Sequence, residues 1–428
     1  MIHTSQQAAV QGAPPSSSKA LSLVPAGTQG TRQIFTSERS LTGVRVHRRR
    51  TRRSPEGIAE LPPPTAKLLR LHTICPYYTM FPLKFPFEAL KDADDGDWVL
   101  DPFCGRGTTT FAARLRGLPS VGIDSNPVAA AVAAAKLVAP RLRDVIAIAE
   151  DALASDECDD VPTGRFWELC YHPETLVGIC KLRRRLLSRC KSDAEIALRA
   201  LILGILHGPR QKGPPTYLSS QMPRTYSSKP ASAIRYWERH HILQPPRVDV
   251  LDAVTRRAHF TLAEVPPATP GLVSFGDSRR VNLSPPGETR CAWIVTSPPY
   301  FGMRTYRPDQ WLRNWFLGGP PHVDYSQEGQ LAHHADGFAE QLGRVWSNVA
   351  SACVANARLV VRFGCIPSSP VKPQELIIRS LESSGRSWRL VSVRDGGSAG
   401  NGKRQSDQFG RTTQAAKQEV DIVAVLED

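Results

Sequence analysis

Trp98-Val-Leu-Asp-Pro-Phe-Cys-Gly-Arg-Gly-Thr-Thr109 passes from an apolar run into a turn with two glycines and then into a helix-forming segment. The run from Trp98 to Asp101 predicts a buried strand, and residues 108–117 predict a helix. A second unit of the same kind follows, with the strand Ser-Val-Gly-Ile-Asp at 120–124 and an alanine-rich helix at 127–138. Strands that alternate with helices in this way predict a doubly wound parallel sheet of the α/β class.

This alternation stops near residue 140 and resumes near residue 270. Between these points the apolar spacing predicts a mostly helical insertion, residues 141–268, with its clearest helices at 165–190 and 192–208. The elements predicted after the insertion are strands at 272–277, 291–296 and 357–363, helices at 337–354 and 373–384, and β-rich runs at 388–393 and 419–426. The sheet is therefore predicted to form from residues 60–140 and 270–428.

The chain of 428 residues is basic, with 54 Lys and Arg against 40 Asp and Glu, a formal charge of +14 and a pI near 9.6. Such an excess favours a polyanionic partner, and nucleic acid is the most common one. Residues 1–55 have no hydrophobic period and predict a disordered basic arm. Its five arginines within residues 48–53 either contact a phosphate backbone, belong to a solvated tail, or reflect an overlong gene start.

Nine cysteines are scattered along the chain without a Cys-x-x-Cys pair, and no His lies at zinc-ligand spacing, so no metal site is predicted. An odd number of cysteines without a disulfide framework fits reduced thiols in a cytosol. The sequence has no apolar run of about eighteen residues and no apolar signal core, so we expect a cytoplasmic protein without a membrane-spanning helix.

A second short motif, Thr296-Ser-Pro-Pro-Tyr300, follows the apolar run 291–296. Its two prolines stiffen the turn and leave carbonyl groups free to accept hydrogen bonds. Ser297 Oγ and the Pro298 carbonyl are suited to accept from the two N–H bonds of an amino group, and Tyr300 offers a face on which a flat ring can stack. Taken alone, the motif also fits an ordinary turn or a proline-rich ligand of a binding module.

Together, residues 101–109, the stretch Gly122-Ile-Asp-Ser-Asn-Pro127 and the diproline motif resemble the S-adenosylmethionine-dependent amino-methyltransferases of DNA, particularly the N4-cytosine enzymes. The resemblance covers about residues 75–140 and 270–425. It implies a Rossmann-like class I methyltransferase fold and transfer of a methyl group from S-adenosylmethionine to the exocyclic amine of a flipped-out base. Ser297 is typical of N4-cytosine enzymes, whereas N6-adenine enzymes usually carry Asp or Asn there, so adenine stays open.

The resemblance also implies roles for single residues. Asp101 interacts with the ammonium of the methionine moiety, Asp124 accepts from the ribose hydroxyls, and Asp277 approaches the adenine amino group, or else only caps a turn. Residues 81–86 are similar to the segment that closes over the methionine end. The candidate cofactor-binding residues are Phe85, Pro86, Asp101, Pro102, Phe103, Gly105, Gly107, Thr108, Asp124 and Asp277. The candidate catalytic residues are Ser297, Pro298, Pro299 and Tyr300.

Three basic stretches are candidates for nucleic-acid contact, two of them with interleaved aromatic residues. Residues 217–237 lie in the insertion and either contact the substrate or form a helical cap whose arginines face water. Residues 304–313 follow the diproline motif and border the active site or form a lid, and residues 400–405 form a basic loop. The candidate contacts are Arg224, Lys229, Arg235, Arg304, Arg307, Lys403 and Arg404.

The expected partner is double-stranded DNA, with RNA as the alternative, and with a cognate restriction endonuclease if the enzyme belongs to a restriction-modification system. The closest rival is an RNA methyltransferase acting on guanine N2 or adenine N6, and a different class is a non-catalytic nucleic-acid-binding module of the same fold. The glycine turn matches neither a phosphate loop nor a nicotinamide site. The insertion lies between the stretch 122–127 and the stretch 276–279, where the family has none, so the sequence does not locate the recognition region.

Overall fold

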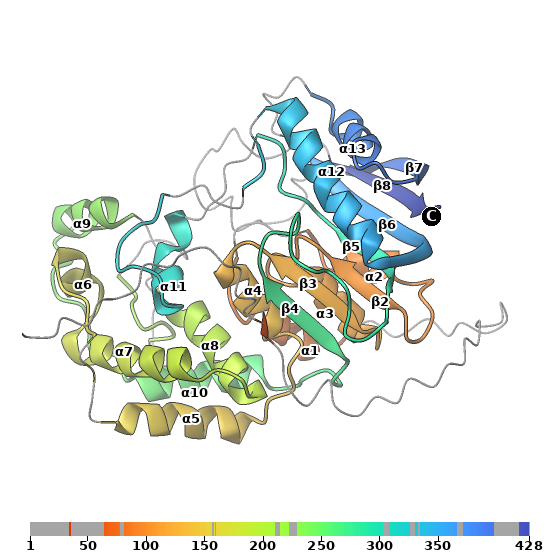
Figure 1. Ribbon diagram of the computed structural model, residues 1–428. Coiled ribbons are helices and arrows are strands. Elements are labelled where there is room, and N and C mark those ends of the chain that lie inside the picture. Colours follow the sequence, from red (N-terminus) through yellow and green to blue (C-terminus); the bar gives the residue numbers. More distant parts are fainter. Residues whose placement is uncertain are drawn as a thin grey trace, which may run out of the picture. The chain divides into compact units, whose positions relative to one another are not determined.

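Within the described residues, eight strands form a single sheet (Figure 1). The computed structural model describes residues 34–35, 64–77, 81–155, 158, 160–209, 215–221, 229–302, 308–325, 330–332, 334–365, 371–397 and 419–427. The strands are β1 (Ile34–Phe35), β2 (Trp98–Asp101), β3 (Ser120–Asp124), β4 (Gly271–Phe275), β5 (Cys291–Thr296), β6 (Cys353–Gly364), β7 (Trp388–Gly397) and β8 (Glu419–Leu426). Their order across the sheet is β1-β4-β3-β2-β5-β6-β8-β7.

The central strands β4, β3, β2, β5 and β6 are parallel, whereas β8 is antiparallel to both of its neighbours. From β2 the chain builds β3 and β4 on one side and then crosses to build β5 and β6 on the other. The strand order therefore reverses between β2 and β5, and in doubly wound sheets ligands bind beyond the carboxyl ends of the strands at this switch point. The predicted doubly wound α/β fold is confirmed.

Most predicted helices are present with bounds within a few residues of the prediction, but the run 165–190 forms two helices that are separated at Tyr171 and His172. The helices before the insertion are α1 (Leu68–His72), α2 (Lys84–Ala89), α3 (Thr108–Leu115) and α4 (Pro127–Ala134). Those of the insertion are α5 (Leu142–Ala154), α6 (Arg165–Cys170), α7 (Pro173–Ser188), α8 (Asp193–Ile205), α9 (Pro230–Arg239) and α10 (Val250–Thr261). Those that follow β5 are the short 3₁₀ helix η2 (Pro308–Gln310), α11 (Trp311–Phe316), α12 (Ala335–Ser351) and α13 (Pro373–Glu382).

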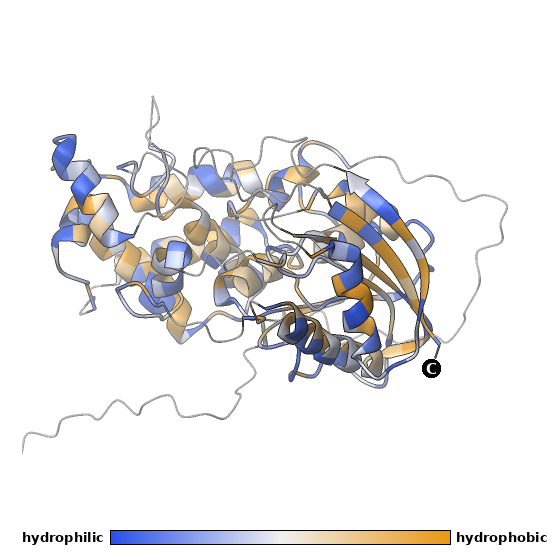
Figure 2. Ribbon diagram, turned by 90° about the horizontal axis from the view of Figure 1, so that it is seen from above, coloured by the Kyte–Doolittle hydropathy of each residue, from blue (hydrophilic) through white to orange (hydrophobic). Residues whose placement is uncertain are grey.

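Alternate residues of the central strands are buried on opposite faces of the sheet, as strand geometry requires. Val99 and Val295 pack on the face covered by α2 and α3. Leu100 and Ile294 pack on the other face, against α12 and α13. Burial on both faces explains why these strands are nearly continuous apolar runs in the sequence, and Figure 2 shows the strands largely in the hydrophobic colour.

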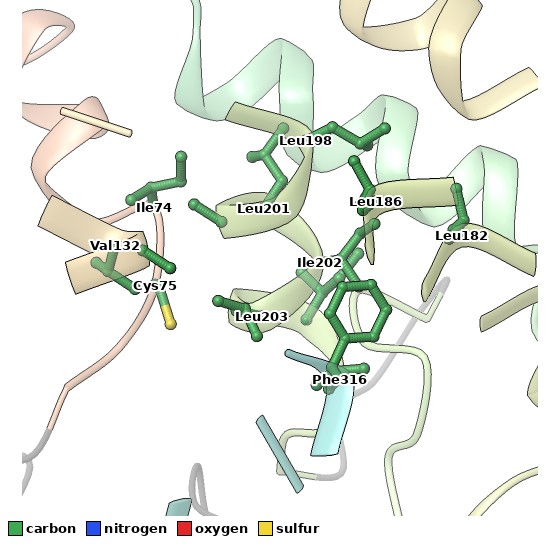
Figure 3. Packing of buried hydrophobic residues seen from close by; sticks show 14 of the residues in the cluster. Ile74, Cys75, Val132, Leu182, Leu186, Leu198, Leu201, Ile202, Leu203 and Phe316 are labelled. Carbon is green, nitrogen blue, oxygen red and sulfur yellow. The ribbon is translucent and has the colours of Figure 1, made fainter. Parts of the chain in front are cut away.

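The insertion shares a hydrophobic core with the helices of the sheet domain. Helix α8 is buried on all sides, and its apolar residues pack against α4, α7 and α11 (Figure 3). The residues shown there include Ile74, Cys75, Val132, Leu182, Leu186, Leu198, Leu201, Ile202, Leu203 and Phe316. Residues from Gln33 onward form one compact unit, so the insertion is continuous with the sheet domain.

The buried side chain of Arg114, in α3, holds both ends of the insertion. Its guanidinium donates to the carbonyls of Lys136 and Val138, where the chain leaves the sheet domain, at 2.6 and 2.9 Å. It also donates to the carbonyls of Pro266 and Pro267, just before β4, at 2.5 and 3.0 Å. Burial lowers the pKa of Arg114 to about 10, so the guanidinium is still charged at neutral pH.

Helix α8 begins with a capping box. The Glu195 carboxylate accepts from the backbone N–H groups of Lys191 and Ser192, each at 2.9 Å, and pairs with Arg185 at 2.9 Å. Ser192 Oγ accepts in return from the Glu195 N–H at 3.3 Å. Burial acts to raise the pKa of Glu195, but the backbone donors and Arg185 outweigh it and lower that pKa to about 2. The carboxylate therefore stabilises the helix start in its ionised form.

Two residues of the predicted disordered arm belong to the sheet. Ile34 and Phe35 form β1, which pairs antiparallel with β4 through Ser274 and Val273. The prediction for residues 1–55 is therefore wrong at these two positions, because their backbones complete the edge of the sheet. The arginine cluster at 48–53 lies outside the described residues.

The described residues contain no helix long and apolar enough to cross a membrane. They also contain no group of three or more His, Cys, Asp or Glu side chains that could hold a metal ion. All nine cysteines are free thiols, and seven of the nine are buried in the two larger hydrophobic clusters.

Candidate functional site

The two sequence motifs meet at the carboxyl edge of the sheet. Strands β2 and β5 are parallel neighbours, so the segments that follow them lie side by side. Thr296 Oγ1 donates to Asp101 Oδ1 at 2.6 Å, and Thr109 Oγ1 donates to the Val295 carbonyl at 3.0 Å. Two direct hydrogen bonds thus join motifs that are almost two hundred residues apart in the chain.

Asp101 is a fully buried carboxyl at the centre of this edge. Its Oδ1 accepts from Thr296 and from the Phe103 N–H, the latter at 3.1 Å, whereas Oδ2 has no hydrogen-bond partner among the described residues. Burial raises the pKa of Asp101 to about 6, against the opposing effect of these donors. A buried acceptor without a donor is costly, and a cationic ligand group would satisfy it.

The two glycines of the turn after β2 have left-handed backbones, with φ of 50° at Gly105 and 76° at Gly107. A Cβ at Gly107 would lie 2.8 Å from Ala133 Cα, so the turn packs directly against α4. A Cβ at Gly105 would meet nothing within 4 Å. Gly107 therefore allows close packing of the turn and a bend into α3, which begins at the buried Thr108. Gly105 leaves open space beside the edge of the sheet.

Asp124, at the end of β3, fixes the glycine turn. Its Oδ2 accepts from the Gly105 N–H and its Oδ1 from the Asn126 N–H, both at 2.8 Å. Asn126 in turn caps α4 and donates to the Tyr77 hydroxyl at 3.1 Å. Because each carboxylate oxygen can accept more than one hydrogen bond, ribose hydroxyls would share Asp124 with these backbone groups.

Asp277, which follows β4, is paired within its own turn. It forms a bidentate ion pair with Arg279, with a shortest contact of 2.6 Å, and accepts from the Arg279 N–H at 3.0 Å. Burial opposes the shift, but the Arg279 bonds lower the pKa of Asp277. The neighbouring Ser278 Oγ donates to the Pro102 carbonyl at 2.5 Å. The structure thus shows the turn-capping role for Asp277, and an adenine amino group would share a carboxylate already bound to arginine.

The diproline motif presents its residues with different exposures. Ser297 and Tyr300 are half-buried, Pro298 is buried and Pro299 is exposed. The Tyr300 hydroxyl donates to Glu419 Oε1 at 2.8 Å, and its ring contacts Phe363 edge-on, with centroids 5.8 Å apart. The sequence analysis missed Glu419, because no local pattern connects the first residue of β8 with a tyrosine 119 positions earlier.

Residues 81–86, which are similar to the segment that closes over the methionine end, overlap the start of the short helix α2. Pro86 is buried in it. The guanidinium of Arg362 lies 4.2 Å above the ring of Phe85 and pairs with Asp421 at 2.6 Å. Phe103, from the glycine turn, contacts Trp346 of α12 edge-on, with centroids 6.4 Å apart. Phe85 and Phe103 are half-buried and pack in different hydrophobic clusters, Phe85 with α2 and α3 and Phe103 with α12 and α13.

Of the candidate nucleic-acid contacts, Lys229 and Arg235 are exposed, just before and within α9. Lys229 Nζ lies 5.4 Å from the ring centroid of Tyr325, which is 63% exposed. No structural statement applies to the remaining candidates, which lie outside the described residues: Arg224, Arg304, Arg307, Lys403 and Arg404.

Several aromatic and basic residues near these candidates are part of the core, so the substrate role predicted for their segments is wrong at these positions. Trp237 is fully buried and donates through Nε1 to the Gln221 carbonyl at 2.8 Å. Trp311 and Arg313 are each 2% exposed, and Arg313 donates to the carbonyls of Leu203 and Pro76. Both residues attach α11 to the insertion. Arg313 does so through its hydrogen bond to Leu203 of α8, and Trp311 belongs to one buried cluster of aromatic rings from α6, α9 and α11.

The part of the chain that contains the glycine turn matches a known protein family. Residues 56–135, which include β2, the glycine turn and Asp124, match the family model described as DNA methylase. The match covers 80 of the 428 residues and ends well before the diproline motif. No curated protein matches the chain.

Three solved structures that match the chain are distant from it in sequence. The rRNA methyltransferase AviRa from Streptomyces viridochromogenes is 14% identical, with 82% of this chain and 87% of that chain covered and a TM-score of 0.30. A SAM-dependent methyltransferase from Methanosarcina mazei is 9% identical, with 81% and 98% covered and a TM-score of 0.30. A geranyl diphosphate methyltransferase in complex with SAM is 10% identical, with 80% and 84% covered and a TM-score of 0.31.

The strand order itself defines the class of fold. The parallel strands reverse their order between β2 and β5, and the antiparallel strand β8 lies between β6 and β7, which is the arrangement of Rossmann-like class I methyltransferases. The chain has this fold, and its cofactor region is similar to that of DNA methylases.

Proposed function

We propose that the protein is a DNA methyltransferase that transfers a methyl group from S-adenosylmethionine to cytosine N4 of a flipped-out base. The observation that carries this proposal is the contact between Thr296 and Asp101, 2.6 Å long, which joins the glycine turn to the diproline motif. A methyl donor beside the turn and an amine beside the motif would therefore share one edge of the sheet.

The residues of the turn suit this cofactor. The unpaired Asp101 Oδ2 is a ready acceptor for the ammonium of the methionine moiety, and the space beside Gly105 admits a ligand close to the backbone. Asp124 lies at the end of the adjacent strand, where nucleoside-binding folds commonly place an acidic residue for the ribose. When bound, S-adenosylmethionine supplies an electrophilic methyl group on a sulfonium.

The diproline motif suits an exocyclic amine. The nitrogen lone pair of cytosine N4 is delocalised into the ring, so acceptors for its two N–H bonds must draw the nitrogen toward a tetrahedral shape. Ser297 Oγ and the Pro298 carbonyl would accept these bonds, and Tyr300 would hold the base by stacking, a contact worth about 1–3 kcal/mol. S-adenosylmethionine held beside Asp101 and Gly105 would supply the methyl group to the amine held by Ser297 and Pro298, and the acidic methylated amine would release its proton to water.

Three features support DNA as the substrate. The cofactor region matches DNA methylases, the formal charge is +14, and Lys229 and Arg235 are exposed on the insertion. Ser297 favours cytosine N4, as the resemblance implies. DNA adenine N6, and guanine N2 or adenine N6 of RNA, are the alternative targets, and a cognate restriction endonuclease is a proposed partner.

The test is a methyl-transfer assay that identifies substrate, base and atom together. Purified protein is incubated with tritiated S-adenosylmethionine and either plasmid DNA or total RNA, and the digested nucleosides are separated by mass spectrometry. We expect labelled N4-methylcytosine from DNA only. The variant Tyr300→Ala should lose turnover but keep cofactor binding. The surface variant Glu288→Ala, at an exposed residue just before β5 and therefore at the opposite edge of the sheet, should match the parent. Protein that takes up no cofactor would instead be a nucleic-acid-binding module.

A further inference from the structure

A residue of the last strand, β8, orients the ring of Tyr300. Its hydroxyl donates to Glu419 Oε1 at 2.8 Å, and Glu419 is 5% exposed. Glu419 is the first residue of β8 and pairs with Gly364 at the end of β6 and with Gly397 at the end of β7. Its side chain is thus anchored at the carboxyl edge of the sheet, where the diproline motif also lies.

Two contacts together restrict the side chain of Tyr300. The hydroxyl bond fixes the far end of the ring, and the edge-on contact with Phe363 limits rotation of the ring about its long axis. The backbone is held as well, because the next residue, Phe301, forms a parallel bridge with Cys365. A ring held at its backbone, its tip and its edge has a defined plane before any substrate arrives.

The environment of Glu419 favours its role as a hydrogen-bond acceptor. Asp421 lies two residues further along β8, therefore on the same face, and forms an ion pair with Arg362. Burial acts to lower the pKa of Arg362, but the hydrogen bond to Asp421 and the nearby Glu419 carboxylate raise it. The same guanidinium lies over Phe85. One face of β8 thus supports both Tyr300 of the diproline motif and, through Arg362, Phe85 of α2.

We propose that Glu419 is a positioning residue of the active site, which holds the plane of the Tyr300 ring so that it receives the target base in stacking geometry. This inference rests on the proposed methyl transfer. Glu419 acts through Tyr300, and the advantage it gives is preorganisation of the ring, which costs nothing at the moment of binding.

The experiment is a double-mutant cycle in the methyl-transfer assay. Tyr300→Phe removes the hydroxyl and keeps the ring, Glu419→Ala removes the acceptor, and the double variant removes both. We expect each single variant to lower kcat about tenfold and the double variant to be no worse than either single one, because the two residues act as one unit. Glu419→Gln retains an acceptor oxygen and should recover most of the lost activity.

A purely structural role for Glu419 predicts a different pattern. Cofactor affinity, measured by calorimetry, should stay within about twofold of the parent in all these variants, because Asp101 and Asp124 are untouched. Loss of fold would lower cofactor affinity and kcat together. The matched control is Glu427→Ala, which removes a half-exposed carboxylate paired with Arg389 just after the other end of β8 and should leave kcat unchanged.

The outcomes separate the two proposals. A parent that methylates DNA while Glu419→Ala matches its kcat overturns the positioning role alone, as does a double variant whose defect is the product of the two single defects. A parent that binds cofactor but methylates neither DNA nor RNA overturns the proposed function and the positioning role with it.

Discussion

Replacement of Asp101 by asparagine separates the stability of the fold from the chemistry of the site. Burial raises the pKa of this carboxyl from 3.8 to about 6. The folded protein therefore holds its proton at pH values where the unfolded chain has already released it, and stability is lost as the pH rises from 3.8 through 6. At about 1.4 kcal/mol per pKa unit the full loss is about 3 kcal/mol at neutral pH.

The substitution keeps the geometry and removes the charge. The asparagine oxygen can still accept from Thr296 and Phe103, and its amide stands where the unpaired Oδ2 was. An unpaired buried amide costs about 1–3 kcal/mol at every pH, so the absolute stability of Asp101→Asn is not decisive. The change with pH is decisive: relative to the parent, the variant should gain about 2 kcal/mol between about pH 4.5 and about pH 7.5.

Urea unfolding followed by circular dichroism measures this difference at both pH values. Leu100→Ala, in the same strand, is the control, because neither side chain ionises. It should lower the free energy of unfolding by about 2–5 kcal/mol, and by the same amount at both pH values. A free-energy difference between Asp101→Asn and its parent that does not change with pH would refute the reasoning. In calorimetry the same variant should bind S-adenosylmethionine about 10- to 100-fold more weakly, since it loses a charge-assisted hydrogen bond. Unchanged affinity would exclude Asp101 as the partner of the ammonium.

Three further predictions concern Arg114, the capping box and the glycine turn. Arg114→Met should lower the free energy of unfolding by about 3–5 kcal/mol, because four backbone carbonyls lose their donor; a loss below about 1 kcal/mol in urea unfolding would contradict this. Glu195→Gln should remove the contribution of Glu195 to acid sensitivity, about 3 kcal/mol of stability that the parent loses as the pH falls from 4.5 to about 2 and this carboxylate takes up a proton. Equal slopes of stability against pH in the variant and the parent would show that Glu195 is not responsible. Gly105→Ala should cost about 1–2 kcal/mol of stability and weaken cofactor binding, whereas Gly107→Ala should destabilise the fold further, because its Cβ would meet Ala133 at 2.8 Å; equal thermal shifts in the two variants would contradict the assigned geometry.

The strands and the meeting of the two motifs could be predicted from the sequence, because they depend on local patterns. The apolar run 98–101 is buried on both faces, and such a strand looks the same in any doubly wound sheet. Parallel strands also place their carboxyl ends at one edge, so Asp101 and Thr296 had to come close once β2 and β5 paired. What the motif could not show was that one oxygen of Asp101 lacks a donor, since this depends on packing around the side chain.

The insertion was harder to interpret, because aromatic and basic residues occur both in cores and on binding surfaces. Trp237 and Arg313 look like substrate contacts in the sequence, yet both are buried and hydrogen-bonded to backbone carbonyls. Arginine can be buried when its donors are satisfied by carbonyls, and tryptophan when its N–H is satisfied. The sequence does not distinguish a buried tryptophan or arginine from an exposed one, because the backbone carbonyls that accept their hydrogen bonds lie 16 and 110 residues away in the chain.

The position of the insertion explains how so long a segment leaves the site intact. Strands β3 and β4 are adjacent and parallel, so a crossover must join them in any case, and the insertion enlarges this crossover. Its two ends are held together by hydrogen bonds from Arg114 to the carbonyls of Lys136 and Pro266. The cost of closing a longer loop grows only slowly with its length. The carboxyl ends of β2, β3 and β5, which carry Asp101, Asp124 and Thr296, therefore keep the arrangement of an uninterrupted sheet.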